Sequence, residues 1–172
     1  MNQIKAKILL PLASSLAALA INANPVEIGG LSYEVNTQDK TATLVSGAES
    51  SLSSMTSITV PTTIESDGDI YTVTGVGPNV FSGLRNLESV SLPSTITTIG
   101  SGAFSCSGLR YIEIPAKVRE IANSTFSECL QLEDIKFPPH LTKIGEQAFF
   151  ECGFKTLEIP EGVTTICGAA FA

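Results

Sequence analysis

The sequence contains no tryptophan, a single histidine (His140) and few charged side chains, which make up 16% of its 172 residues. One histidine cannot form a multi-histidine metal site, and no Ser, Cys or acidic pattern frames His140 as a catalytic base. Basic residues are also scarce, since 10 Lys and Arg stand against 17 Asp and Glu. This acidic balance argues against nucleic-acid binding, which a basic patch usually marks. The 43% of hydrophobic residues excludes a disordered chain.

Motifs for cofactors and metals are missing as well. Glycine-rich corners such as Gly100-Ser101-Gly102 lack the lysine and the spacing of a phosphate-binding loop. Asp67 and Asp69 flank a turn glycine, but no complete calcium loop follows. We therefore expect no catalytic residues, no cofactor and no metal, and we predict that the protein is not an enzyme.

Residues 1–23 have the layout of a secretory signal peptide. Lys5 and Lys7 form a basic start, an uncharged apolar run spans residues 8–21, and small residues follow. The alternative is a membrane-spanning helix, but the run is shorter than the roughly 20 apolar residues that a span needs, and Pro11 interrupts it. No second long apolar run follows, so we expect a secreted or cell-surface protein without a membrane span after cleavage. Cleavage removes Lys5 and Lys7 and leaves 8 basic and 17 acidic residues, a net charge of −9.

Much of the remaining chain is a repeat. Prolines that follow an apolar residue recur with spacings of 22, 23 and 22, at Pro93, Pro115, Pro138 and Pro160. Phenylalanines recur with spacings of 23, 22, 23 and 22, at Phe81, Phe104, Phe126, Phe149 and Phe171. Two independent markers with one period indicate stacked structural units.

Each unit follows the pattern L-x-x-I-x-I-P-x-x-V-x-x-I-G-x-x-A-F-x-x-C. Ile112-Glu113-Ile114 alternates apolar and polar residues, as a half-buried strand does, and Pro115 ends the strand because it lacks an N–H. One unit cannot bury its apolar residues alone, so the units must stack. The sequence therefore predicts a repeat solenoid that is mainly β, right-handed and built of 22–23-residue units.

The repeated unit resembles the BspA-like, or treponemal-type, leucine-rich repeat family. The motifs L-x-x-I-x-I-P and I-G-x-x-A-F-x-x-C carry the resemblance, which is tight over residues 87–172 and loose over residues 58–81. The resemblance implies a curved leucine-rich-repeat solenoid. It also implies secretion or cell-surface display, commonly in host-associated bacteria, with adhesion to proteins as the usual role.

Residues 24–80 are expected to form an N-terminal cap, because terminal units must cover the open end of the core. Two β-hairpins are predicted there, one between Leu31–Val35 and Thr41–Val45 and the other at Asp67-Gly68. The predicted organisation is a signal peptide at 1–23, a cap with β-hairpins and a first atypical repeat at 24–80, and leucine-rich repeats at 81–172.

The repeats stop in mid-unit at Phe171-Ala172, and no polar capping unit follows. An uncapped end exposes apolar side chains and unpaired backbone groups. Two explanations remain open: the chain is a fragment of a longer array, or the protein self-associates through this end. We favour the fragment, with repeats truncated at the C-terminus.

Cys106, Cys129 and Cys152 recur at intervals of 23, two or three residues after the phenylalanine, where the preceding unit has Leu84. This spacing does not suit a zinc site, whose ligands usually lie close in sequence. Disulfides between adjacent units are compatible with a secreted protein. Because cysteine exchanges with leucine at one position, we favour free, buried thiols.

Outward side chains of the predicted strands form two columns, and the concave face is the usual binding surface of a solenoid. The candidate partner-binding residues are Tyr111, Glu113, Asp134, Lys136, Thr156 and Glu158. Tyr111 is the favoured anchor, because tyrosine is enriched at binding hot spots. The alternative is that these side chains are merely solvated, since every solenoid has outward positions.

We predict a secreted or cell-surface leucine-rich-repeat protein that mediates protein–protein interaction or adhesion through its concave face. Its partner is expected to be a protein, such as an extracellular-matrix or cell-surface protein, and not a nucleic acid. The first alternative is a structural spacer or a repeat fragment of a larger surface protein. Further alternatives are an appendage of a secreted enzyme and a glycan-binding module, against which the single facing aromatic, Tyr111, counts.

Overall fold

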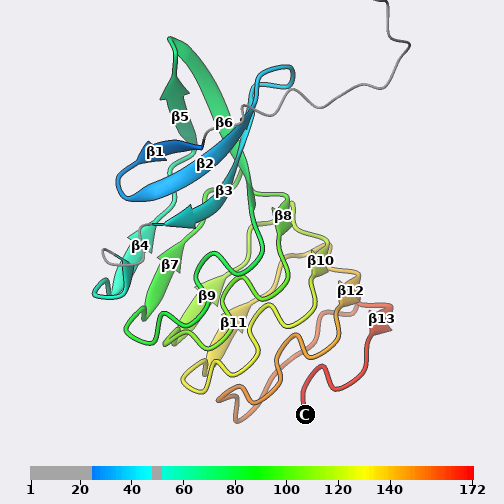
Figure 1. The fold of residues 1–172 in the computed structure, drawn as a ribbon. Helices are drawn as coiled ribbons and strands as arrows, with labels where there is room; N and C mark the ends of the chain where they lie inside the picture. The colour runs from blue at the N-terminus through cyan, green and yellow to red at the C-terminus, as the bar shows by residue number, and fades with distance from the viewer. Residues whose placement is uncertain (1–24, 48–51) are drawn as a thin grey trace, which may run out of the picture.

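The computed structural model describes residues 25–47 and 52–172, which form a mainly-β fold. The signal peptide predicted for residues 1–23 lies outside the described residues. Figure 1 shows a sheet of longer strands at the N-terminal end and a stack of short strands that continues toward the C-terminus. In the stack, equivalent residues of successive units lie side by side, as the repeat predicts.

The N-terminal sheet contains β1 (Val26–Ile28), β2 (Leu31–Asn36), β3 (Thr41–Gly47), β5 (Thr63–Ser66) and β6 (Asp69–Val76), in the order β1-β2-β3-β6-β5. β2 and β3 pair antiparallel around a turn at residues 37–40, and β5 and β6 pair antiparallel around Asp67-Gly68. Both predicted hairpins are therefore confirmed. β3 also pairs with β6 in parallel, which joins the two hairpins in one sheet.

The first column of the stack is a sheet of parallel strands in the order β11-β9-β7-β4. Its strands are β4 (Ser57–Thr59), β7 (Ser89–Ser91), β9 (Tyr111–Glu113) and β11 (Asp134–Lys136). In each strand the middle residue is buried and its two neighbours are exposed, which is the predicted alternation. We call the exposed side of this sheet the strand face.

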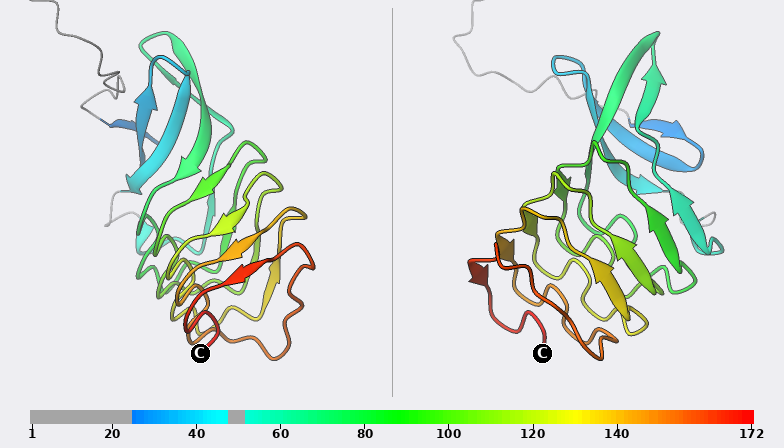
Figure 2. Two further views of the ribbon diagram at one scale, coloured as in Figure 1. Left: turned by 90° about the vertical axis from the view of Figure 1, so that its right-hand side faces the viewer. Right: turned by 180° about the vertical axis from the view of Figure 1, so that it is seen from behind.

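The second column contains β8 (Thr98–Ile99), β10 (Glu120–Ile121), β12 (Lys143–Ile144) and β13 (Thr165–Ile166). These strands lie on another side of the stack, as the two views of Figure 2 show. β10, β12 and β13 pair in parallel, and β8 pairs with the end of β6 at Gly75 and Val76. Because β6 belongs to the N-terminal sheet and also pairs with β8, backbone hydrogen bonds connect that sheet directly to the repeats.

A column of stacked phenylalanines organises the core. Ring centroids lie 5.2 Å apart for Phe81–Phe104, 5.2 Å for Phe104–Phe126 and 5.3 Å for Phe126–Phe149. These four rings are at most 2% exposed. The backbone N–H of each of the first three also donates to a carbonyl of the next unit, as from Phe126 to Ala148 at 2.9 Å. Backbone pairing and ring stacking therefore hold the units in the same register.

Left-handed backbone conformations recur at two places in the units. The first place, two residues before the phenylalanine, is occupied by Asn79, Gly102, Ser124, Gln147 and Ala169, with φ between 53° and 65°. The second place, two residues after the phenylalanine, is occupied by Gly83, Cys106, Glu128 and Glu151. Residues other than glycine adopt this conformation at a steric cost. The repeat motif does not reveal these turns, because the residue types there differ from unit to unit.

Cys106 does not share a position with Cys129 and Cys152, so that part of the cysteine prediction is wrong. The φ of Cys106 is 57°, which matches the 59° of Glu128. Ser107 occupies the position equivalent to Cys129, and its Oγ lies 3.4 Å from Cys129 Sγ. Phe104 and Phe126 are 22 residues apart, so the interval of 23 from Cys106 leads one residue past its equivalent, Glu128. All four cysteines are free thiols, and Cys129 is buried.

The strand predicted around Thr156 and Glu158 is absent, because residues 154–160 form no strand. β11 is the last strand of the first column, and backbone pairing in the following unit resumes where the Thr164 N–H donates to Thr142 O at 2.9 Å. A three-residue strand depends on hydrogen bonds to its neighbour, and Leu157 below this segment is only partly buried. Thr156 and Glu158 therefore lie on an irregular extension of the strand face.

Candidate functional site

Four of the six predicted partner-binding residues lie on two adjacent strands of the strand face. β9 supplies Tyr111 and Glu113, and β11 supplies Asp134 and Lys136. The parallel register pairs Tyr111 with Asp134 and Glu113 with Lys136. Since paired strands lie about 4.8 Å apart, each pair of side chains is close enough for direct contact. The structure therefore brings these four residues together in a two-by-two arrangement.

Glu113 and Lys136 form an ion pair across the two strands. Lys136 Nζ donates to Glu113 Oε1 at 2.8 Å, and both side chains are more than half exposed. The hydrogen bond to Glu113 and its negative charge raise the pKa of Lys136 above the usual value for lysine. An exposed ion pair contributes little to stability because water and salt screen it. Its main effect is to hold both side chains in one orientation beside Tyr111.

Two shallow hollows lie on this face. One, of about 390 Å³, is lined by Val90, Ser91, Leu92, Ser94, Tyr111, Glu113, Pro115 and Ala116. The other, of about 630 Å³, is lined by residues of the next two units, among them Asp134, Lys136, Thr156 and Glu158. All six predicted residues therefore line these two hollows, although Thr156 and Glu158 lie outside the regular strands.

The side chains of the strand face offer groups for aromatic contact, hydrogen bonding and ion pairing. Tyr111 is 44% exposed and presents an aromatic ring with a hydroxyl group, while its neighbours present carboxylates, an ammonium group and hydroxyls. Within residues 25–47 and 52–172, no group of three or more His, Cys, Asp and Glu side chains is arranged to hold a metal ion. His140 is an exposed residue in the turn after Pro138 and Pro139.

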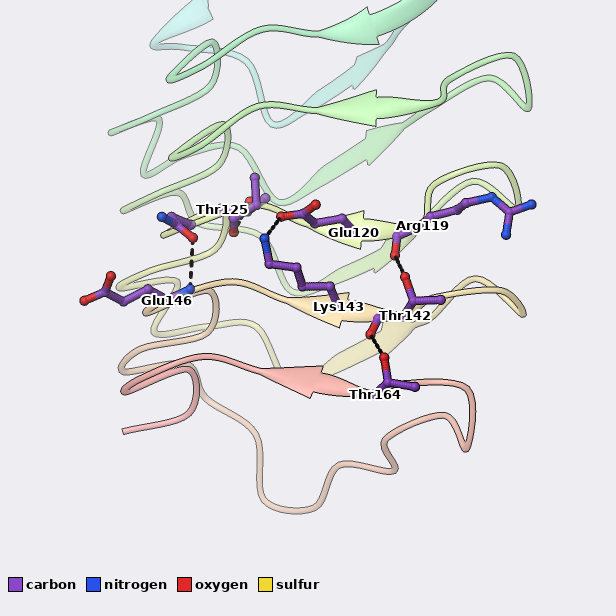
Figure 3. A network of polar contacts seen from close by, with 9 residues as sticks. Arg119, Glu120, Thr125, Thr142, Lys143, Glu146 and Thr164 are labelled. Atoms are coloured by element: carbon purple, nitrogen blue, oxygen red, sulfur yellow. Dashed lines mark hydrogen bonds and ion pairs between the residues drawn. The ribbon is translucent and has the colours of Figure 1, made fainter.

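A second polar face, which was not among the predicted sites, covers the second column. Thr142 Oγ1 donates to Arg119 O at 3.1 Å, and Thr164 Oγ1 donates to Thr142 O at 3.3 Å (Figure 3). On β12 and β10, Lys143 Nζ donates to Glu120 Oε1 at 2.7 Å. The two polar positions of the V-x-x-I segment could have indicated this face, because they repeat in register with the strands.

Residues 25–47 and 52–172 contain no helix that is both long enough and apolar enough to span a bilayer.

A sequence profile described as the BspA type leucine rich repeat region matches residues 49–172 in six copies. Among solved structures, a leucine-rich repeat protein from Bacteroides ovatus is 34% identical over 82% of this chain, with a TM-score of 0.75. The leucine-rich repeat protein of T. pallidum is 27% identical over 86% of this chain, with a TM-score of 0.72. The pneumococcal vaccine antigen PcpA is 20% identical over 83% of this chain and 46% of its own, and its TM-score of 0.62 indicates a similar fold.

The match to these structures does not extend over their full length. This chain spans 37% of the Bacteroides ovatus chain and 66% of the T. pallidum chain. No curated protein matches it.

Proposed function

Since the chain belongs to the family of BspA-type leucine-rich repeat proteins, we propose that it binds a protein partner through its strand face, outside the bacterial cell or at its surface. The export part of the proposal rests on residues 1–23, with their basic start and apolar run, acting as a signal peptide. Residues 24–80 would then cap the N-terminal end of the repeats. Adhesion to an extracellular-matrix or cell-surface protein is the specific role we propose.

One observation carries the proposal for the binding surface. Tyr111 stands exposed next to the Glu113–Lys136 ion pair and Asp134, and all four side chains line hollows of the same face. Tyrosine supplies a large amphipathic contact area at a low cost in side-chain entropy, which is why it is frequent at binding hot spots. The surrounding polar groups would give the contact its orientation.

The backbone beneath these side chains favours tight recognition. β7, β9 and β11 are hydrogen-bonded to one another, and their middle residues are buried in the core. Side chains on such a support lose little freedom on binding, so less of the contact energy is offset by ordering. The partner is expected to meet a rigid surface rather than a loop that folds around it.

The test is a binding measurement with the purified protein against extracellular-matrix proteins, bacterial surface extracts, glycans and the protein itself. The site variant combines Tyr111→Ala, Glu113→Ala, Asp134→Ala and Lys136→Ala. The matched control combines Thr98→Ala, Glu120→Ala, Lys143→Ala and Thr165→Ala, which also removes one ion pair but from the second column. Saturable binding to a protein that only the site variant loses would support the proposal. Equal binding by both variants would contradict the site.

The second candidate function is a structural spacer. The continuous phenylalanine column and the ion pairs that bridge successive units favour it, because both stiffen the array along its length. The 37% share of the Bacteroides ovatus chain is compatible with a role inside a longer protein. Absence of binding to every member of the panel would favour the spacer over the binding module.

A further inference from the structure

A hollow of about 640 Å³ lies on the second column, away from the strand face. Its lining residues are Thr97, Thr98, Ile99, Lys117, Arg119, Glu120 and Ala122. They come from β8, β10 and the segments that lead into these strands. Figure 3 shows Arg119 from the side, with its guanidinium group extending away from the strands. We call this feature the basic hollow, because Lys117 and Arg119 are among its lining residues.

The charges of the hollow do not cancel. Glu120 is the only acidic residue in the lining, and its carboxylate is already paired with Lys143 Nζ at 2.7 Å. Lys117 and Arg119 form no ion pair with any residue of the described ranges 25–47 and 52–172. Two uncompensated cations therefore share one hollow in a chain whose formal net charge is −7. An acidic segment is the complementary occupant.

The chain itself carries a segment of that kind at the tip of the β5–β6 hairpin. Glu65, Asp67 and Asp69 lie within five residues, and Ile70 beside them is 65% exposed. Asp69 is paired with Lys40 at 2.7 Å, whereas Glu65 and Asp67 form no ion pair within the described part of the chain. The tip is acidic and leaves a large apolar side chain in water.

The tip is also narrow and rigid. Asp67 and Gly68 have φ of 54° and 79°, which is the geometry of a two-residue hairpin turn. The register pairs Ser66 with Asp69 directly, so the hairpin remains closed up to the turn. A preorganised tip can enter a shallow hollow without a large loss of conformational entropy.

Within one molecule the tip cannot reach the hollow. β6 leads from Asp69 at the tip to Val76, and Val76 pairs with Ile99 at the hollow. Eight residues of extended strand span about 26 Å. Figures 1 and 2 show the hairpin projecting from the N-terminal end, away from β8 and β10. A contact between the two features therefore requires two molecules.

We propose that the β5–β6 hairpin tip of one molecule docks in the basic hollow of a second copy. Glu65 and Asp67 then face Lys117 and Arg119, and Ile70 is covered by the surface of the second copy. The two surfaces are different, so each molecule can offer a tip to one neighbour and a hollow to another. Such head-to-tail contacts generate rings or open chains of molecules instead of two-fold dimers. This contact leaves the strand face free and is independent of the proposed partner binding.

The contact is expected to be weak, because a hairpin tip buries far less than the roughly 1,000 Å² of a stable interface. Sedimentation equilibrium of the purified protein, at concentrations up to about millimolar, measures association in this range. The variants are Lys117→Glu with Arg119→Glu for the hollow, and Glu65→Lys with Asp67→Lys for the tip. Each pair of charge reversals is expected to weaken association by about tenfold or more.

The decisive variant carries all four charge reversals. It restores opposite charges between tip and hollow, so its association is expected to return to near the level of the unmodified protein. The control reverses Arg85 and Lys155, two cations that form no ion pair with described residues and lie outside the hollow. Circular dichroism and melting curves check that every variant is folded. A monomer at all concentrations, or association that survives either pair of reversals, would overturn the proposal.

Discussion

Phe104 and Phe126 stack with ring centroids 5.2 Å apart and ring planes 3° from parallel, although 22 residues separate them in the chain. The contact is possible because the Phe104 N–H donates to Thr125 O in the next unit, which aligns the two backbones directly beneath the rings. The same arrangement repeats along the column from Phe81 to Phe149. Phe104 and Phe126 therefore each stack against two neighbouring rings, and the loss of either ring affects three units.

Replacement of Phe126 by alanine is expected to lower the free energy of unfolding by about 3–5 kcal/mol. The ring is fully buried between Phe104 and Phe149, so its removal leaves a cavity that neither neighbour can fill. Urea denaturation followed by circular dichroism measures the change. Leu130→Ala in the same unit is the control, because Leu130 is 62% exposed and its loss is expected to cost less than about 0.5 kcal/mol. Similar losses in both variants would contradict a packing role for the column.

Replacement of Gln147 by glycine is expected to raise the free energy of unfolding by about 0.5–1 kcal/mol. Gln147 is exposed and has a φ of 53°, a conformation that costs energy for any residue with a Cβ. The control is Glu146→Gly at the adjacent exposed position, whose φ is not left-handed. That variant is expected to lose about 0.5–1 kcal/mol, because glycine makes the unfolded chain more flexible. Thermal unfolding measures both variants. A gain in stability for Gln147→Gly together with a loss for Glu146→Gly would identify the left-handed turn as the cause, whereas a loss in both variants would contradict it.

Replacement of Tyr33 by phenylalanine is expected to stabilise the protein by about 1 kcal/mol at neutral pH. The Tyr33 side chain is fully buried, and its hydroxyl group has no hydrogen-bond partner among the described residues. Chemical denaturation of the two proteins side by side measures the difference. A loss of stability in the variant would mean that the hydroxyl group is hydrogen-bonded in solution.

The same pair of proteins gives a prediction for alkaline pH. Burial raises the pKa of Tyr33 to about 12, from the 10.0 of an exposed tyrosine. The unfolded chain therefore loses this proton first, and stability that is fully present below pH 10 is lost as the pH rises toward 12. The advantage of Tyr33→Phe is expected to grow by about 2 kcal/mol over that range. A constant difference between the two proteins across the range would contradict the burial of this hydroxyl group.

The four thiols are expected to react with iodoacetamide at different rates. Cys129 Sγ and Cys152 Sγ donate to backbone carbonyls at 3.0 Å and 3.1 Å, and burial raises the pKa of both, for Cys152 to about 12. Cys106 and Cys167 are partly exposed and lack such a hydrogen bond within the described structure. Because the thiolate is the reactive form, alkylation of Cys106 and Cys167 at pH 8 should be at least about tenfold faster. Mass spectrometry of timed samples measures this, and the unfolded protein is the control.

The sequence alone predicted the repeat, the alternating strands of the first column and the two N-terminal hairpins. These features depend on local patterns that recur or that have strong turn signals, such as Asp67-Gly68 and the prolines that end the strands. The phenylalanine period was also readable, because one large apolar residue per unit must occupy the core. Even the two-by-two arrangement of Tyr111, Glu113, Asp134 and Lys136 follows from the period once the strands stack in register.

Only the tertiary structure decided how the units align where their lengths differ. The interval of 23 residues suggested that Cys106 and Cys129 occupy equivalent positions, but this unit repeats after 22 residues, so Cys106 is equivalent to Glu128. The left-handed turns and the missing strand at Thr156 and Glu158 depend on backbone hydrogen bonds to the neighbouring unit, which no residue type signals. The pairing of Glu120 with Lys143, which leaves Lys117 and Arg119 without a counter-charge among the described residues, likewise depends on which side chains meet in space. Local pattern determines which elements form, whereas contacts between units determine which surfaces they present.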